Sequence, residues 1–525
     1  MSLYDKSSLL QVPSLYKDGT LVSTIPEDRS GDFTVVRGSN LSATRIGPDG
    51  YIKKGYENLL LQSNQFDTTW SQVGSFNILG GQQGYDSSNN AWSIESNSTA
   101  FDRRIQQSLS LSGVHTFSVY AKSNSTDWIL FYNGTDRVYF DLANGVVGSS
   151  QSGLIIDSKI EPTSVTGWYR CTATFNRGIS FISVVPASGD GNSNVLAGNS
   201  IYIQDAQLNQ GLVAYPYLET TTAPAQGGLL ENTPRLDWSN GVPSVLVEEG
   251  RTNRIRNSEY VDWSNVNVSL DRNYGISPEG VKNSLKVTSV TSLSRLQTSI
   301  SLPANIDFTF SLFIKNIDAT ESRIYGVIDT IQYDIFWNGA EISSVTTGLN
   351  YESFSNGWYR VWETSQSDTS SQFRIYPERG ANVGSIEIYG LQLEEASYPT
   401  SYIPTYGTSQ TRSNEVISDN FNIPTTATIY NSFYSDVAET VFVFDQVFNV
   451  VEGLNKVAIA FSPTAVKISV GGSIVANATG TYDTTSLTNI QLGSNNGTDY
   501  SNAPISGFYV FPEFLTDEEL NSLTD

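Results

Sequence analysis

Hydrophobic and polar residues alternate over short stretches along this chain. From His115 the sequence HTFSVY puts Phe117 and Val119 on one face of an extended strand, with polar residues on the other face. Further on, Tyr169 and Cys171 share one face, and the residues beside them point the opposite way. Clusters of Asn, Ser, Gly and Asp, which favour turns, separate these stretches. The pattern predicts short antiparallel strands joined by turns.

Part of this strand pattern occurs twice in the same order. The sequence GWYR at 167–170 recurs unchanged at 357–360. Four further pairs of landmarks accompany it: NLLLQS at 58–63 with NRIRNS at 253–258, Trp70 with Trp263, TFSVYAK at 116–122 with TFSLFIK at 309–315, and SIYI at 200–203 with SIEI at 385–388. The spacing between landmarks differs by only a few residues, a change that loops tolerate and strands do not. We therefore predict a duplicated domain of roughly 160 residues.

Repeated short strands predict an all-β chain of tandem antiparallel jelly-roll β-sandwiches. One short helix is expected at the C-terminal end, where Thr516 and Glu519 match a capping box. A glycine-containing hairpin precedes each copy, at 45–52 and at 236–242. We divide the chain into an N-terminal segment (1–45), a first sandwich (46–222), a second sandwich with its leading hairpin (223–406) and a small C-terminal β-domain (407–525).

The composition supports several hydrophobic cores and narrows the choice of partners. The 525 residues are 39% hydrophobic and 12% aromatic, enough for multiple folded domains. The net charge of −23 repels nucleic acid and anionic membrane surfaces, so we expect neither as a partner. We find no apolar run of membrane-spanning length and no apolar signal-peptide core, so we expect synthesis in a cytoplasm without membrane insertion.

The sequence offers little for catalysis or metal binding. Its single histidine, His115, begins an alternating strand, and the nucleophile-elbow pattern GxSxG is absent, so we expect no enzymatic activity. The single cysteine, Cys171, excludes an internal disulfide and is expected to be a buried thiol. We expect no cofactor. Structural calcium is conceivable at the turns 189–192 and 495–499, which also fit ordinary β-turns.

Aromatic residues provide the candidates for ligand binding, because a flat ring packs against the apolar face of a pyranose. We interpret the repeated GWYR residues as maintaining the fold, since both copies retain them: Trp168, Tyr169, Arg170, Trp358, Tyr359 and Arg360. The middle of each copy varies more, and loops there would determine specificity. The ligand-binding candidates are therefore the aromatic residues of that region: Trp128, Tyr132 and Trp337.

Several motifs resemble a family of bacteriophage virion proteins. They are LQVPS at 10–14, GDFTVVRGS at 31–39, PRLD at 234–237, PSVLVE at 243–248, and LQLEE at 391–395 followed by YPTSYIPT at 398–405. In that family the last motif closes a carbohydrate-binding-like sandwich. The first copy departs from it, with QLNQ at 207–210 and YPYL at 215–218. The tail, from LNKVAIA at 454–460 to LTDEEL at 515–520, is similar to the closing half of a laminin-G or concanavalin A-like domain.

The resemblance implies a tail-fibre, tail-associated or capsid-decorating protein that is made in the host cytoplasm and located in the virion. It further implies a homotrimer whose residues 1–45 attach to capsid or tail proteins and whose sandwiches bind host-surface glycans. Residues 407–525 would then form a laminin-G or lectin-like domain. Two alternatives stay open: a capsid or tail component that binds only other virion proteins, and a depolymerase of surface polysaccharide.

Overall fold

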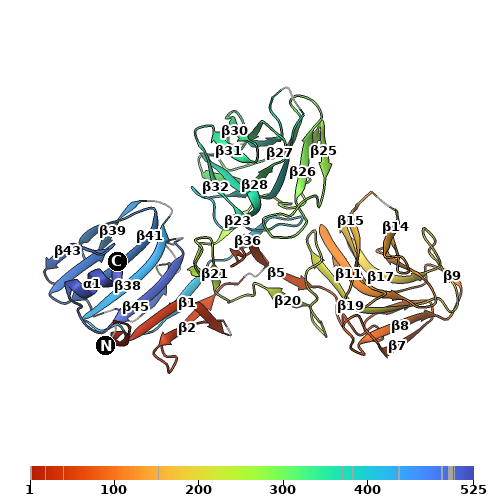
Figure 1. The fold of residues 1–525 in the computed structure, drawn as a ribbon, viewed down its shortest axis with the longest axis horizontal. Helices are drawn as coiled ribbons and strands as arrows, with labels where there is room; N and C mark the ends of the chain where they lie inside the picture. Colours follow the sequence, from red (N-terminus) through yellow and green to blue (C-terminus); the bar gives the residue numbers. More distant parts are fainter. Residues whose placement is uncertain are drawn as a thin grey trace.

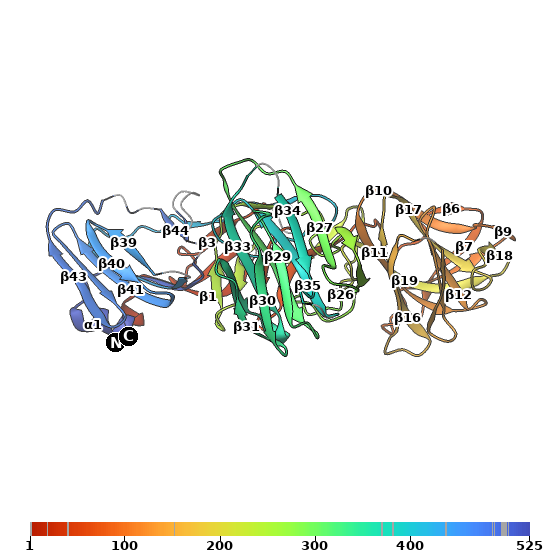
Figure 2. The ribbon, with the colours of Figure 1, turned by 90° about the horizontal axis from the view of Figure 1, so that it is seen from above.

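Three lobes surround a central junction in the computed structural model of this chain (Figure 1). The structure describes residues 3–525 except 18, 39–40, 152, 369–370, 381–382, 436–437, 486, 488, 495–500 and 502. Seen from above, the lobes lie side by side in a flattened molecule (Figure 2). Over the described residues the regular elements are strands, apart from the C-terminal helix and two short 3-10 helices. The predicted all-β class with one C-terminal helix is therefore confirmed.

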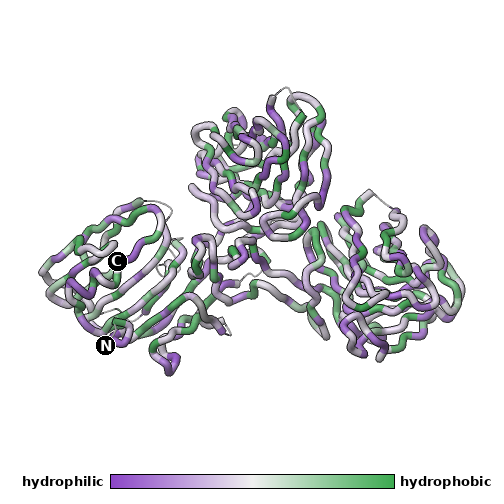
Figure 3. The backbone as a smooth tube through the Cα atoms, in the orientation of Figure 1, coloured by the Kyte–Doolittle hydropathy of each residue, from purple (hydrophilic) through white to green (hydrophobic). Residues whose placement is uncertain are grey.

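The first sandwich consists of two six-stranded antiparallel sheets. The first sheet has the order β14 (Val146–Gln151), β13 (Arg137–Asp141), β12 (Trp128–Tyr132), β17 (Ile179–Ala187), β10 (Arg104–Leu111), β6 (Ser71–Val73). The second has the order β15 (Ile155–Pro162), β16 (Trp168–Asn176), β11 (Val114–Ser123), β19 (Ser200–Gln210), β8 (Ala91–Ser96), β7 (Phe76–Gln82). A small ribbon pairs β9 (Ala100–Phe101) with β18 (Asn194–Val195). Phe117, Val119 and Phe131 are buried between the sheets, and the alternation along the strands can be followed in Figure 3.

The second sandwich repeats this topology strand for strand. One sheet has the order β31 (Glu341–Val345), β30 (Tyr333–Asn338), β29 (Glu321–Tyr325), β34 (Ser371–Tyr376), β27 (Arg295–Ile300), β24 (Ser264–Val266). The other has the order β32 (Leu349–Ser353), β33 (Tyr359–Gln366), β28 (Asp307–Asn316), β35 (Ser385–Glu394), β26 (Leu285–Ser289), β25 (Val268–Asp271), and η2 (Ser355–Gly357) precedes β33. The predicted duplication is thus visible as two sandwiches with one strand order.

Equivalent side chains also close both sandwiches with the same hydrogen bonds. Asn58 Nδ2 donates to the carbonyls of Ala206 and Leu218, which fastens the segment after β19 to the strand before the sandwich. Asn253 makes the corresponding pair of bonds in the second sandwich. The segment after β19 therefore closes the first copy as its counterpart does the second, although its sequence departs from the YPTSYIPT form.

The C-terminal lobe is built on one long antiparallel sheet with strands from both ends of the chain. Its order is β43 (Ser473–Thr479), β42 (Ala465–Val470), β41 (Gly453–Ser462), β38 (Ala427–Ser435), β45 (Ile505–Phe511), β1 (Leu9–Lys17), β2 (Thr20–Ile25), β3 (Phe33–Val36), β37 (Val416–Asp419), β44 (Ile490–Leu492). Three further elements belong to this lobe: the hairpin β39 (Glu439–Val443) with β40 (Gln446–Val450), the 3-10 helix η1 (Tyr4–Lys6) and the helix α1 (Asp517–Thr524). The predicted capping box of Thr516 and Glu519 begins α1.

Residues 1–45 are largely part of this lobe, which corrects our prediction of a separate N-terminal segment. Strand β1 pairs with β45, and Leu9, Leu21 and Phe33 are fully buried in the lobe's core. The segment lacks long apolar runs because its strands alternate with period two, and such strands bury only every second side chain. Residues 407–525 alone are therefore an incomplete sandwich, which the start of the chain completes.

The junction contains both of the predicted hairpins. The first is β4 (Thr44–Ile46) with β5 (Ile52–Asn58), extended by β20 (Ala225–Gly228), and the second is β21 (Arg235–Asp237) with β22 (Ser244–Leu246). A further pair joins β23 (Arg251–Asn253) to β36 (Gln410–Arg412). The Ile46 amide donates to Asp237 Oδ2 at 2.7 Å, so the hairpins bind each other instead of each extending its own sandwich.

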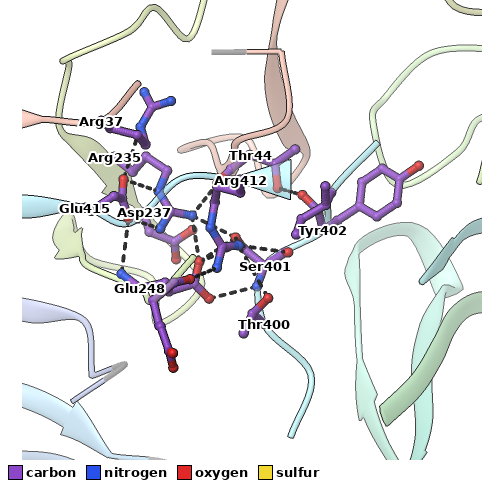
Figure 4. A network of polar contacts seen from close by, with 12 residues as sticks. Arg37, Thr44, Arg235, Asp237, Glu248, Thr400, Ser401, Tyr402, Arg412 and Glu415 are labelled. Atoms are coloured by element: carbon purple, nitrogen blue, oxygen red, sulfur yellow. Dashed lines mark hydrogen bonds and ion pairs between the residues drawn. The ribbon is translucent and has the colours of Figure 1, made fainter. Parts of the chain in front are cut away.

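A buried ion-pair network fixes the junction to the C-terminal lobe (Figure 4). Arg235 Nε donates to Glu415 Oε1 at 2.7 Å, and its Nη1 donates to Glu248 Oε2 at 2.8 Å. Arg412 Nη1 lies 3.1 Å from Glu248 Oε2, and Arg37 Nε lies 3.2 Å from Glu415 Oε1. Burial opposes ionisation of Glu248, but Arg412 and Arg235 outweigh it and lower the pKa of Glu248 to about 2. The network thus holds a charged carboxylate away from water.

A second buried network joins the two sandwiches to the junction. Lys54 of β5 places Nζ 2.7 Å from Glu259 Oε1 and 3.0 Å from Glu279 Oε2, both in the second sandwich. Tyr215, from the segment after β19, donates its hydroxyl to Glu279 at 2.7 Å. Burial opposes the charge of Lys54, but Glu259 and Glu279 raise its pKa well above the usual value. Three parts of the chain therefore meet at one lysine.

Candidate functional site

The repeated GWYR residues lie where they hold each sandwich together. Trp168 and Trp358 are 1% and 0% exposed. Arg170 and Arg360 each donate through Nη2 to a carbonyl of the closing segment, at 2.6 Å and 2.7 Å. Tyr169 and Tyr359 are half-buried and pack against the cores. Neither tryptophan ring has a face exposed to a ligand, which fits the interpretation that these residues maintain the fold.

Trp337 is also buried, which corrects its prediction as a ligand-binding residue. Its side chain is 9% exposed, packs in the core of the second sandwich and donates Nε1–H to Ser322 Oγ at 2.9 Å. A bulge between Phe336 and Trp337 shifts the register of β30 against β31. Phe336 is 39% exposed on the outside, and Trp337 points inward. The inward position follows from plain alternation along β30, because Tyr333, Ile335 and Trp337 are all buried, and the extra residue of the register shift lies in β31.

Trp128 and Tyr132 do lie together, on the outward face of β12. The residues between them alternate, so that Ile129 and Phe131 enter the core and Leu130 remains on the outward side. Both candidate side chains are half-buried and pack against a small buried cluster on that side of the sheet. The structure thus brings two of the three predicted ligand-binding residues onto one surface.

Arginine side chains that the sequence analysis missed surround Tyr132. The Arg137 guanidinium lies 4.3 Å from the Tyr132 ring centre, and Arg104 lies 5.4 Å from Tyr132 and 4.9 Å from Phe181. Phe181 meets Tyr132 edge to face at 5.5 Å. We call Tyr132, Phe181, Arg104 and Arg137 the Tyr132 cluster.

The second sandwich has a related cluster at the equivalent place. Arg374 lies 4.8 Å from the ring centre of Tyr325, and Arg295 lies 5.7 Å from that of Tyr376. The two rings are 5.8 Å apart. We call these four residues the Tyr325 cluster. The repeated tripeptides RIQ at 104–106 and RLQ at 295–297 are the signal in the sequence that could have identified both clusters.

Both clusters lie on the sheets that face away from the junction. On the opposite sheet of the second sandwich, Phe313 and Tyr389 project outward and pack with Ile52 of the junction hairpin. In the first sandwich, Arg170 and Tyr215 connect the corresponding sheet to the junction side. One sheet of each sandwich therefore contacts the junction, and the other carries the aromatic and arginine cluster on its outer side. Part of that side is covered in the first sandwich, since Leu130, Tyr139 and Val185 are fully buried there.

The residues considered for catalysis are enclosed in the first sandwich. His115 is 2% exposed, and burial lowers its pKa to about 4, so the ring is neutral at neutral pH. Cys171 is fully buried, and burial raises the pKa of its thiol well above the usual value. Neither side chain is placed to meet a substrate.

The possible calcium turn at 189–192 uses its oxygens for backbone contacts. Asp190 Oδ1 accepts a hydrogen bond from the Ser149 amide at 2.7 Å, and Asn192 Oδ1 accepts one from the Asn194 amide at 3.1 Å. Over the part of the chain that the structure describes, no group of three or more His, Cys, Asp or Glu side chains could hold a metal ion. The second turn, 495–499, lies outside the described residues. No helix within the described ranges is long and apolar enough to cross a membrane.

A strained carboxylate distinguishes the first sandwich from the second. Asp205 occupies a bulge of β19 with φ of 55°, where the second sandwich has Gly390 with φ of 61°. The Asp205 carboxylate accepts a hydrogen bond from the Tyr85 hydroxyl at 2.8 Å, and the Tyr85 ring stacks on Tyr120 at 3.7 Å. Burial raises the pKa of Asp205 to about 6, partly offset by the Tyr85 hydrogen bond.

Replacing Asp205 by glycine should therefore stabilise the first sandwich by about 1–2 kcal/mol at pH 7.5, because it removes a left-handed non-glycine residue and a desolvated charge. The folded pKa lies above the usual value, so the penalty is present above pH 6 and disappears as the pH falls toward 3.8. Urea unfolding followed by tryptophan fluorescence at pH 7.5 and pH 4 checks this. The reverse change, Gly390→Asp, should destabilise, because a Cβ there would lie 3.1 Å from the Phe313 ring. Equal stability of D205G and the parent at pH 7.5 would contradict the prediction.

The C-terminal lobe has a pocket of about 630 Å³, open to solvent, between its long sheet and the β39–β40 hairpin. Apolar side chains form most of its lining: Ile429, Phe433, Val441, Phe448, Ile459 and Ile505. Few groups in this lining can hydrogen-bond sugar hydroxyls, so this pocket differs in chemistry from the outward clusters of the sandwiches.

Comparison with known proteins adds little beyond this geometry. No family model matches the chain, and no curated protein matches it. Among solved structures, the N-terminal CBM22-1-CBM22-2 tandem domain of Xyn10C from Paenibacillus barcinonensis matches with 12% sequence identity. The match covers 72% of this chain and 98% of that chain, with a TM-score of 0.23. A TM-score this low supports no inference about this chain, and the conclusions below rest on its own residues.

Proposed function

We propose that this protein binds glycans without cleaving them, through the outward faces of its two sandwiches. The observation that carries the proposal is the recurrence of a tyrosine flanked by arginines on that face in both copies. A tyrosine ring stacks on the apolar face of a pyranose, and guanidinium groups donate hydrogen bonds to sugar oxygens. Two such faces on one chain raise the effective concentration of the second binding event.

The arrangement of the lobes favours a scaffold over an enzyme. Buried networks around Arg235 and Lys54 lock the sandwiches to the junction, and the only histidine and cysteine are enclosed. Rigid presentation of two binding faces reduces the entropy lost when both engage a surface. A depolymerase would instead need two carboxyl groups facing each other across a cleft.

We further propose, from the resemblance of its motifs, that the protein is a subunit of a phage particle, as a trimeric fibre or decoration that attaches to host-surface glycans. Because β1, β2 and β3 belong to the C-terminal lobe, attachment to capsid or tail proteins would use that lobe and not a free N-terminal arm. A component that binds only other virion proteins is the alternative within the same class.

Binding to immobilised glycans, together with an assay for newly released reducing ends, tests the proposal. We expect binding without release of reducing ends. The double variant Tyr132→Ala/Tyr325→Ala should weaken binding at least tenfold, because each ring contributes about 1 kcal/mol or more through stacking. Tyr16→Ala, which removes an exposed ring from the C-terminal lobe, is the matched control. Release of reducing ends would support the depolymerase, and no glycan binding at all would contradict the proposal.

A further inference from the structure

We propose that the Tyr132 and Tyr325 clusters each bind a sugar that carries a single anionic group, within a glycan that is otherwise neutral. This inference rests on the proposed glycan binding and specifies its ligand. Three arginines carry it: Arg104 in the first sandwich, and Arg295 and Arg374 in the second.

The first observation is that these arginines have no acidic partner. Over the described ranges, none of the three has a carboxylate oxygen within the 4.0 Å limit for a salt bridge, although the chain has 53 acidic residues and 30 basic ones. Arg137 of the same surface does have one, with Nη2 3.4 Å from Asp102 Oδ2. In so acidic a chain, arginines without an internal counter-ion on an outward face are available to an external anion.

The second observation is that Arg104 and Arg295 are held in the same way. Arg104 Nε donates to Gln106 Oε1 at 2.7 Å, and Arg295 Nε donates to Gln297 Oε1 at 2.7 Å. In each case Nη1 donates to the backbone carbonyl two residues earlier, at 3.0 Å and 3.2 Å. Both of those earlier residues, Asp102 and Leu293, have positive φ, at 56° and 66°.

This arrangement fixes the guanidinium plane before a ligand arrives. The glutamine and the carbonyl use Nε and Nη1, so the Nη2 amino group remains to donate to a ligand oxygen. Arg374 differs in detail: Gln372 Oε1 accepts from both its Nε and its Nη2, so Nη1 is the group left for a ligand, and the guanidinium lies over Tyr325. A preorganised arginine beside an aromatic ring matches a sugar that offers an oxyanion at one edge and an apolar face below.

The net charge of the protein determines whether a glycan with isolated or with closely spaced anionic groups is favoured as ligand. The net charge of −23 repels a polyanion as a whole, whereas a single carboxylate or sulfate meets the local arginine. At 0.15 M salt the screening length is about 8 Å, so the arginine in contact outweighs acidic residues farther away. The clusters therefore favour glycans with sparse anionic groups, such as a neutral backbone with occasional uronate branches.

Titration calorimetry at 0.15 M salt with glucuronoxylan tests the proposal, and the same polymer with its carboxyl groups reduced to alcohols is the matched ligand. We expect the native polymer to bind at least tenfold more tightly than the reduced one. Lightly sulfated dextran shows whether sulfate replaces carboxylate, and heparin supplies a dense polyanion. Tighter binding of either sparsely charged ligand than of its uncharged counterpart supports the inference.

The variants locate the contact. Arg104→Ala alone, and Arg295→Ala with Arg374→Ala, should each lower the apparent affinity for glucuronoxylan about tenfold, and the triple variant should remove the preference over the reduced polymer. Arg29→Ala removes one positive charge, as Arg104→Ala does, at an exposed site in the C-terminal lobe, and it should leave binding unchanged. Thermal melting should show that all of these variants remain folded.

The outcomes separate this inference from the proposed function. Equal binding of the native and reduced polymers, or stronger binding of heparin than of glucuronoxylan, would overturn the inference and leave glycan binding intact. Retention of the preference by the folded triple variant would also overturn it. Absence of binding to every glycan, neutral ones included, would overturn the proposed function itself.

Discussion

Replacing Arg235 by methionine is expected to lower the free energy of unfolding of the C-terminal lobe by about 3–5 kcal/mol. Arg235 is fully buried and hydrogen-bonds to both Glu415 and Glu248. Without it the cationic partners of the two carboxylates, within the described residues, are Arg37 at 3.2 Å from Glu415 and Arg412 at 3.1 Å from Glu248. A methionine fills much of the volume but leaves the buried carboxylate charge uncompensated. The uncompensated charge accounts for most of the expected loss of stability.

The effect of R235M should depend on pH with a definite sign. The folded pKa of Glu248, about 2, lies below its usual value of 4.5, so its contribution to stability is present above pH 4.5 and is lost as the pH falls toward 2. The variant should have lost part of this contribution already at neutral pH. Its stability should therefore change less between pH 5 and pH 2.5 than that of the parent, as measured by urea unfolding.

Arg254→Met is the matched control for Arg235, because Arg254 forms an exposed pair with Glu395 at 3.2 Å. The control should cost less than about 1 kcal/mol. Small-angle scattering adds a second measurement, since loosening of the junction should increase the radius of gyration of R235M at neutral pH. If R235M were as stable and as compact as the control, the buried network would not hold the lobes in place.

Replacing Lys54 by methionine is expected to be similarly damaging, at about 3–5 kcal/mol, and to affect both sandwiches. Lys54 is the cation between Glu259 and Glu279, and its side chain is 2% exposed. Burial raises the pKa of Glu259, with a further increase from Glu279, and Lys54 and the hydrogen bond from Tyr406 offset part of that increase. Without the lysine, folding at neutral pH must either bury two carboxylates together or take up a proton.

The pH dependence of K54M and its rescue by a second substitution test this prediction. Because carboxyl groups with raised folded pKa values destabilise only where they are ionised, K54M should recover part of its stability as the pH falls from 7 toward 5. The added substitution Glu259→Gln should restore part of the loss at pH 7. The neighbouring exposed lysine serves as control: Lys53→Met removes a pair with Asp49 at 2.6 Å and should cost less than about 1 kcal/mol. A loss equal to that of the Lys53 control would contradict the assigned role.

Most of the fold could be predicted, because strands and duplication leave local signals. The repeated GWYR and TFS motifs lie on β16, β33, β11 and β28, and these strands occupy equivalent places in the two sheets. The capping box at Thr516 is also local, since its bonds span three residues. Such features depend on neighbours in sequence, and the sequence alone therefore reveals them.

Only part of the candidate site could be predicted from the sequence. Tyr132 could be proposed from its residue type, and its outward position followed from the alternation along β12. The prediction for Trp337 was wrong although a local signal was present, because the alternation of Tyr333, Ile335 and Trp337 along β30 turns its side chain into the core. Arg104 and Arg295 were missed because they stand out only by lacking an acidic partner. Recognising this lack requires the positions of the chain's 53 acidic residues in space.

By itself, the sequence determined that this chain is all-β, that one sandwich was duplicated, and that an acidic surface disfavours dense polyanions. Only the tertiary structure decided that β1–β3 complete the C-terminal lobe, that the hairpins form a junction, and that Arg235 and Lys54 lie at its centre. The physical reason is the separation along the chain between the residues that interact. Alternation and turn chemistry are set by adjacent residues, whereas sheet edges and buried charges are satisfied by partners hundreds of residues away, as β1 is by β45.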